Sequence, residues 1–124
     1  MKSNIVDYQS AYNSISELSK SNTKKIALLS NFTIDQLELF LKVDLFRQNI
    51  YCEFYIPGYN QYEIEINNFK SDFYKFKPDI VFFILDLPSD HPDFVWNNDE
   101  KENEKIIEIY IEKLNNLVSK IKSK

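Results

Sequence analysis

The first pattern along the chain has the period of a helix. Between Asp7 and Ser19, apolar and aromatic residues recur at steps of three and four residues, which places them on one face of a helix. The residues on this face are Tyr8, Ala11, Tyr12, Ile15 and Leu18. A polar stretch from Ser19 to Lys25 follows, and we interpret it as a connector.

Three apolar segments predict strands. Ile26–Leu29 and Ile80–Leu85 are continuous apolar runs without alternation, which is typical of strands buried on both faces. Ile80–Leu85 is the clearest of them. Tyr51–Ile56 is rich in strand-forming residues and is stopped by the pair Pro57-Gly58.

Two capping patterns predict helices between these strands. Thr33, followed three residues later by Gln36, has the spacing of a capping box and predicts a helix over about 34–47. Asn60 and Glu63 repeat the spacing and predict a short helix over about 61–67. We expect a further helical turn over about 71–76.

The last segment reads as a loop followed by a long helix. The loop spans 87–98, and the helix begins near Asp99, with an acidic first turn and lysines in its last turn, as the helix dipole favours. Its apolar stripe consists of Ile107, Tyr110, Ile111, Leu114, Leu117, Val118 and Ile121.

The alternation of strands and helices predicts an α/β fold. Right-handed crossovers between successive strands give a short parallel sheet in the order 2-1-3, within a three-layer sandwich of flavodoxin-like type. We expect one domain over 1–124, with a helical extension over 1–24, a βαβαβ core over 25–86 and the terminal helix over 99–124.

Composition narrows the function classes. The single glycine, Gly58, excludes phosphate-binding loops and dinucleotide fingerprints, which need two or three glycines. One cysteine, Cys52, and one histidine, His91, cannot form a disulfide or a usual four-ligand zinc site. We therefore expect no metal and no cofactor. We expect Cys52 to be a small buried hydrophobic residue.

The charge balance argues against nucleic acid. Lysine and arginine number 15 against 19 acidic residues, and Arg47 is the only arginine. The longest apolar run is too short to span a membrane, and the polar start does not resemble a signal peptide. The expected location is the cytoplasm.

Candidate site residues gather where the parallel strands end. In a 2-1-3 sheet, ligands bind beyond the carboxyl ends of the strands, between the first and the third. The residues expected in this crevice are Ser30, Asn31, Thr33, Asn60, Gln61 and Asp86. Thr33 and Asn60 are expected to act first as helix caps, and Ser30 and Asn31 to hold the turn by bonds to the backbone.

Ser30 is also a candidate nucleophile, with His91 as the only imidazole that could serve as its base. Asp86 fits neither of two phosphate chemistries. A haloacid-dehalogenase motif requires Asp-x-Asp, but Pro88 holds the second position, and a phospho-receiver needs an acidic pair where Ser30-Asn31 stands. Asp86 is expected to cap the next segment or to accept a hydrogen bond in the crevice.

Three blocks in order resemble a known family. The blocks Lys25–Thr33, Tyr55–Ile66 and Phe76–Val81 resemble the region upstream of the phosphatase-like domain in FkbH-like proteins, and Asn-Gln-Tyr-Glu at 60–63 is the most distinctive part. The resemblance covers about 25–86. It implies a fold similar to SGNH hydrolases, and a role in polyketide or surface-polysaccharide pathways that use an acyl carrier protein.

Carried over by position, the resemblance places Ser30 at the nucleophile position, Asn60 near the second block, and Asp86 where such hydrolases usually have asparagine. The chain has neither the phosphatase-like domain nor the late Asp-x-x-His block that supplies the base. The resemblance therefore implies an accessory module that binds an acyl carrier protein or a companion enzyme and does not act alone as a catalyst.

Two other hypotheses stay open: a small acyl or ester hydrolase that uses Ser30, and a protein-interaction or immunity-type protein. A three-stranded sheet also has open edges, so we expect the terminal helix or a second chain, as in a homodimer, to cover one of them.

Overall fold

A parallel sheet of three strands organises the chain. The computed structural model describes residues 5–16, 23–92, 94 and 99–124. Strands β1 (Lys24–Ser30), β2 (Cys52–Tyr55) and β3 (Ile80–Ile84) form a sheet in the order β2-β1-β3, which confirms the predicted α/β fold and strand order. The register sets Ile26 beside Phe54 on β2 and beside Ile80 on β3.

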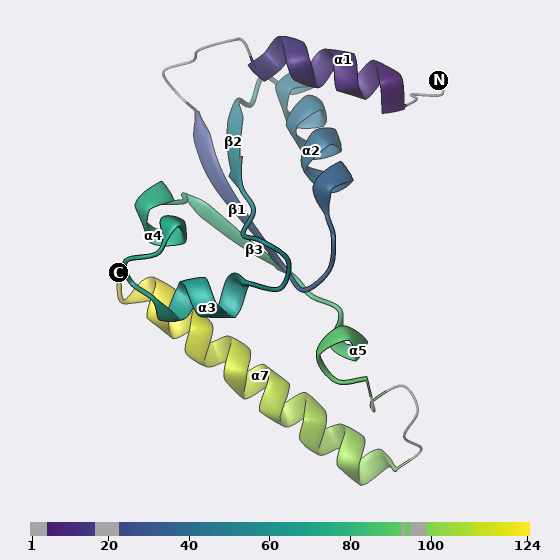
Figure 1. Cartoon of the computed structure of the whole chain (residues 1–124), viewed down its shortest axis with the longest axis vertical. Coiled ribbons are helices and arrows are strands. Elements are labelled where there is room, and N and C mark those ends of the chain that lie inside the picture. The colour runs from purple at the N-terminus through teal and green to yellow at the C-terminus, as the bar shows by residue number, and fades with distance from the viewer. Residues whose placement is uncertain (1–4, 17–22, 93, 95–98) are drawn as a thin grey trace.

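Helix α2 (Asp35–Arg47) covers one face of the sheet (Figure 1). Side chains alternate along β1, so Ile26 and Leu28 point to this face and are buried there. Helix α1 (Ile5–Ser16) lies against α2, where the Tyr8 hydroxyl donates to Asp44 at 2.9 Å.

Three helices cover the opposite face of the sheet. They are α3 (Tyr62–Asn67), α4 (Asp72–Phe76) and the long α7 (Glu100–Lys122). Ala27 and Leu29 of β1 belong there to one apolar cluster with seven buried or half-buried side chains of these helices, which are Tyr62, Ile66, Phe73, Tyr74, Leu114, Leu117 and Ile121. Strand β1 is therefore buried on both faces, which explains why its sequence is a continuous apolar run.

The start of α7 confirms the sequence prediction. Asp99 occupies the N-cap, and its carboxylate accepts the backbone N–H groups of Lys101 at 3.0 Å and Glu102 at 3.4 Å. A short helix α5 (Leu87–Asp90) occupies the first part of the expected loop. Residues 93 and 95–98 of that loop lie outside the described residues, as do residues 17–18 of the first expected helix and residues 19–22 at its end and in the expected connector.

The two predicted capping boxes are wrong. Helix α2 begins after Ile34, so Thr33 lies outside it, and no side chain caps the helix. Helix α3 has Gln61 at its N-cap, also without a side-chain cap, and Asn60 adopts a left-handed backbone with φ of 52°. In each case the helix begins two residues beyond the expected cap, so the hydroxyl or amide cannot reach the first turn.

The expectation that β3 is buried on both faces is also wrong. Ile80 is 43% exposed and Phe82 is 50% exposed on the face that α2 covers elsewhere. The apolar stripe of α7 is only partly buried, since Ile107 and Ile111 are exposed. The exposure of β3 follows from its place in the sheet, because β3 is an edge strand and pairs only with β1 among the described residues.

Left-handed backbone is supplied here by residues other than glycine. Asn49, Asn60 and Lys77 have positive φ, whereas Gly58 does not. Asn49 ends α2 in a Schellman arrangement, in which its N–H donates to Phe46 O at 2.9 Å and the N–H of Ile50 donates to Leu45 O at 2.8 Å.

Candidate functional site

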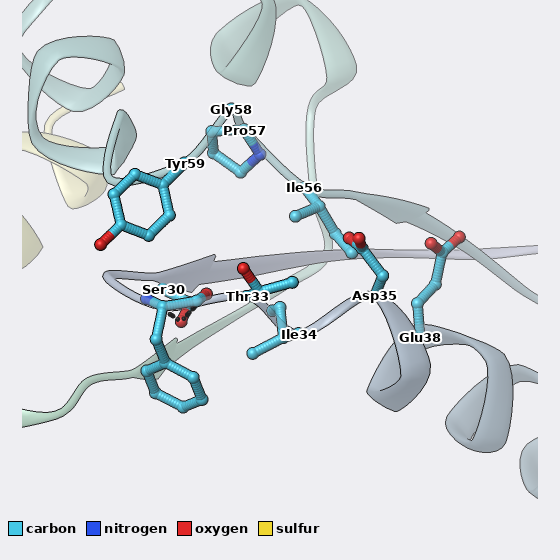
Figure 2. Close-up of a pocket in the computed structure, with 10 residues that line it drawn as sticks. Ser30, Thr33, Ile34, Asp35, Glu38, Ile56, Pro57, Gly58 and Tyr59 are labelled. Carbon is cyan, nitrogen blue, oxygen red and sulfur yellow. Dashed lines mark hydrogen bonds between the residues drawn. The ribbon is translucent and has the colours of Figure 1, made fainter.

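A cavity of about 390 Å³ opens beyond the carboxyl ends of β1 and β2. Figure 2 shows hydroxyl, apolar and carboxylate side chains around it, drawn from the turn after β1, the start of α2 and the turn after β2. Its lining residues are Ser30, Phe32, Thr33, Ile34, Asp35, Glu38, Ile56, Pro57, Gly58 and Tyr59. A cavity of this size at the carboxyl end of a parallel sheet is the usual place for a ligand.

Ser30 reaches this cavity with its hydroxyl bonded to the adjacent turn. Ser30 Oγ donates to Phe32 O at 2.9 Å and accepts from Phe32 N at 3.1 Å. The hydroxyl therefore closes the turn after β1, as expected from the sequence. Its proton is directed at a carbonyl oxygen, which cannot serve as a general base.

Asn31 is buried and joins the ends of two strands. Its Nδ2 donates to Asp86 O at 2.7 Å, and its Oδ1 accepts from Asp86 N at 2.9 Å. The side chain thus continues the pairing of β1 with β3 beyond the last strand residue. Asn31 and Asp86 do not line the cavity beside Ser30.

Asp86 takes the capping position expected for it. It precedes α5, and its carboxylate accepts the Ser89 hydroxyl at 2.6 Å, while its backbone carbonyl accepts the Ser89 N–H at 3.1 Å. Asp86 therefore holds the first turn of α5 and lies across the β1–β3 junction from the cavity residues.

The remaining candidates divide between the cavity and its rim. Thr33 lines the cavity, with its side chain exposed beside Ile34. Asn60 and Gln61 are exposed and follow the lining residue Tyr59, and Gln61 Nε2 donates to Tyr59 O at 3.4 Å. These two residues shape the turn behind Tyr59 and are not part of the cavity wall.

His91 lies in a different cluster, against α7. Its ring packs edge-on against Tyr110 with ring centroids 5.7 Å apart. The neighbouring Asp90 accepts the Tyr110 hydroxyl at 2.9 Å and the Tyr62 hydroxyl at 3.5 Å, and lies 3.7 Å from Lys113 Nζ. His91 therefore belongs to the contacts that fasten α5 to α3 and α7, and it is not among the cavity residues that include Ser30.

Ionisation in this second cluster is shifted by burial. Burial raises the pKa of Tyr110, and the hydrogen bond to Asp90 raises it further. Burial also raises the pKa of Tyr62. Burial opposes the charge on Lys113, but the acidic groups of Tyr62, Glu63 and Asp90 outweigh it and raise the pKa of this lysine. The arrangement keeps both phenols neutral and the ammonium charged at neutral pH.

Sequence reasoning missed the acidic wall of the cavity. Asp35 and Glu38 occupy the first turn of α2 and turn their carboxylates toward the cavity (Figure 2). Glu38 also accepts the Tyr12 hydroxyl at 3.1 Å. The helix pattern after Thr33 contained the signal, since residues of a first helical turn lie next to the crevice. Within the described residues, no group of three His, Cys, Asp or Glu side chains is placed to hold a metal ion.

Cys52 is buried, as expected, in the sheet face beneath α2. Burial raises the pKa of its thiol, while Lys42 acts weakly in the opposite direction. A raised pKa reduces the thiolate fraction, so the side chain behaves as a small core residue.

The fold has a relative of known structure. The chain matches the crystal structure of the N-terminal part of the protein BF1531 from Bacteroides fragilis, described as containing a phosphatase domain complexed with Mg, with a TM-score of 0.71 and 22% sequence identity. The match covers 89% of this chain and 29% of that one, so the chain spans less than a third of its relative. At this identity the likeness establishes the fold. No protein-family model and no curated protein sequence matches the chain.

Over the described residues, no helix combines the length and the apolar character that a membrane crossing requires.

Proposed function

We propose that this chain is an accessory binding module of the FkbH-like type, which docks an acyl carrier protein or a companion biosynthetic enzyme at the carboxyl end of its sheet. The observation that carries the proposal is the fold match to part of a protein that contains a phosphatase domain. FkbH-like proteins, which three sequence blocks resemble, combine such a region with a phosphatase-like domain.

The local chemistry supports binding over independent catalysis. Both hydrogen bonds of the Ser30 hydroxyl go to Phe32, and His91 packs on Tyr110 in another part of the chain. A serine nucleophile requires a base within hydrogen-bond reach. Asn31 could polarise a carbonyl group, but both its amide N–H and its amide oxygen are already hydrogen-bonded to the backbone of Asp86.

The cavity suits the neutral part of a phosphopantetheine arm. Ile34, Ile56 and Pro57 offer apolar contacts, and the Thr33 hydroxyl offers a donor and an acceptor for an amide. Asp35 and Glu38 would repel the phosphate, so the carrier protein would keep this group outside the cavity, near the exposed Tyr59.

Calorimetric titration with acyl carrier proteins from the native operon tests the proposal. The carrier is used with and without its phosphopantetheine arm, and we expect the arm to strengthen binding. Thr33→Trp fills the cavity from an exposed position, and should weaken binding of the armed carrier by about tenfold or more. Ile109→Ser, on the exposed surface of α7, is the matched control and should bind like the wild type.

Absence of binding to either form of the carrier, together with no capture of the companion enzyme of the operon, would refute the proposal. If Thr33→Trp and the wild type bound the carrier equally well, the cavity would not be the binding site.

The hydrolase hypothesis rests on the place of Ser30 at the cavity and has its own test. Intact mass is measured after treatment with a fluorophosphonate, with Ser30→Ala as the control. An adduct on the wild type that is absent from Ser30→Ala would establish a reactive serine, and an unmodified wild type would exclude it. A partner gene unrelated to acyl carriers would instead favour an interaction or immunity-type protein.

A further inference from the structure

The outer edge of β3 is open and uncharged. In the described part of the chain, β3 pairs only with β1, so the backbone groups on its other edge have no strand partner. Its five residues, Ile80–Ile84, contain no charge and no proline. Edge strands that stay unpaired usually carry such residues to prevent association.

The other edge of the same sheet provides a comparison. Strand β2 also pairs only with β1 among the described residues, but it is shorter and carries the exposed Glu53 in its middle. Pro57 follows soon after it. The chain therefore protects one edge in the ordinary way and leaves the other suited to pairing.

Apolar side chains are exposed beside the open edge. Phe82 and Ile80 are 50% and 43% exposed, and both line an apolar groove of about 270 Å³ between β3 and α2. The rest of the groove consists of Lys24, Ile26, Leu41, Leu45, Ile50, Cys52 and Phe54.

Helix α7 carries a second exposed apolar strip. Lys113 and Lys120 contact Glu63 and Asn67 of α3, which fixes the flank of α7 that faces α3. Ile107 and Ile111, four residues apart, lie on the opposite flank and are exposed. The chain thus leaves two uncovered apolar features, one on the sheet and one on the helix that covers it.

We propose that two copies of this chain associate through antiparallel pairing of their β3 strands, which joins the two sheets into one. The sequence of β3 favours a second copy because it is self-complementary about its centre. A two-fold axis at Phe82 sets Phe82 opposite its equivalent, Ile80 opposite Ile84, and Val81 opposite Phe83, always on the same face of the sheet.

The distribution of charge also favours contact through the β3 strands. Each copy has a formal charge of −4, so two copies repel over most of their surfaces, and the five uncharged residues of β3 oppose no like charges. A two-fold axis perpendicular to the sheet also leaves both α7 helices on the same face of the joined sheet. Because a pair of five-residue strands is smaller than a standard interface, we expect the dimer to be weak.

Sedimentation equilibrium of the full chain tests the proposal. From micromolar to millimolar concentration, the wild type should rise from 14.8 kDa toward twice that mass. Phe82→Lys places a charge on the edge and opposite its own equivalent, and should weaken the dimer by more than about tenfold. Ile64→Lys, at a position that is 63% exposed on α3, is the matched control and should leave the dimer unchanged.

A crosslink tests the pairing itself. Phe82→Cys in a Cys52→Ala background should form an intermolecular disulfide on mild oxidation, because directly opposed residues of antiparallel strands lie within disulfide distance. Ile64→Cys in the same background should not. A wild type that stays monomeric at all concentrations would overturn the proposal, as would a dimer that neither forms the crosslink nor responds to Phe82→Lys. This proposal is independent of carrier-protein binding, which is measured on a separate surface.

Discussion

Asn31 and Asp86 are joined by two hydrogen bonds that tie the end of β1 to the end of β3. The Asn31 amide donates to Asp86 O at 2.7 Å and accepts from Asp86 N at 2.9 Å, and its side chain is almost fully buried. An amide side chain presents one donor and one acceptor side by side, as a peptide group does. Asn31 therefore acts as one more rung of the parallel ladder.

Replacing Asn31 should destabilise the fold. Asn31→Ala removes both hydrogen bonds and leaves the N–H of Asp86 without this partner, while the Asp86 carbonyl keeps its bond to the Ser89 N–H, so we expect a loss of about 1–2 kcal/mol in the free energy of unfolding. Urea denaturation followed by circular dichroism measures the loss. Asn116→Ala, at an exposed position on α7, should change the free energy of unfolding by less than about 0.5 kcal/mol. Equal stability of the two variants would show that the bonds between Asn31 and Asp86 contribute little.

The architecture was predictable because it depends on features that lie close together in the sequence. The buried run of β1, the stop at Pro57-Gly58 and the N-cap at Asp99 are all local signals, and right-handed crossovers fix the strand order. The exposure of Phe82 was not predictable in this way. An apolar run reports that a strand can be buried, but its actual burial depends on whether another element lies beside it.

The candidate site was predicted at the carboxyl end of the sheet between β1 and β3, whereas the cavity opens beyond β1 and β2, because Asn31 bonds to Asp86 at the β1–β3 junction. Ser30 and Thr33 reach the cavity because the carboxyl end of β1 directs them there. The prediction that Thr33 caps α2 was wrong, because the spacing of three residues between Thr33 and Gln36 also occurs by chance where no helix begins at that position. His91 lies with Tyr110 because α5 folds against α7, a contact between segments that no local pattern reports.

Stability should fall at alkaline pH through the buried phenols. Burial raises the pKa of Tyr110 and of Tyr55, and the hydrogen bonds to Asp90 and Glu65 raise these values further. The folded state therefore keeps protons that the unfolded state releases above about pH 10, so the free energy of unfolding decreases as the pH rises beyond that value.

The variant Tyr110→Phe isolates one of these contributions. It loses a hydrogen bond to Asp90, which costs about 1 kcal/mol at neutral pH, but it should show a shallower loss of stability above pH 10. Urea midpoints between pH 8 and pH 11 measure the slope, with the exposed Tyr59→Phe as the control. Curves for Tyr110→Phe and wild type that stay parallel over this range would contradict the role assigned to Tyr110.

The left-handed residue at the end of α2 gives a backbone prediction. Asn49 has φ of 62°, a conformation that costs most side chains about 1 kcal/mol or more but suits glycine and, to a lesser degree, asparagine. Asn49→Ala should lower the free energy of unfolding by about 1 kcal/mol, and Asn49→Gly should leave it equal or slightly higher. Thermal denaturation of the pair provides the measurement, and the opposite order of stability would exclude backbone strain as the cause.

A substitution at Gly58 can distinguish a structural role of this residue from a role in binding at the cavity. Its φ is not positive, and a methyl group added there would approach only Cγ of the exposed Gln61, at 3.4 Å. Gly58→Ala should therefore fold with equal stability, or with a gain of up to about 1 kcal/mol from a less flexible unfolded chain. Because Gly58 lines the cavity beside Tyr59, the same methyl group should interfere with a ligand that enters there. Thermal denaturation and carrier-protein titration of this one variant distinguish the two roles: unchanged stability with weaker binding assigns Gly58 to the cavity, and a loss of stability would show that the turn itself requires glycine.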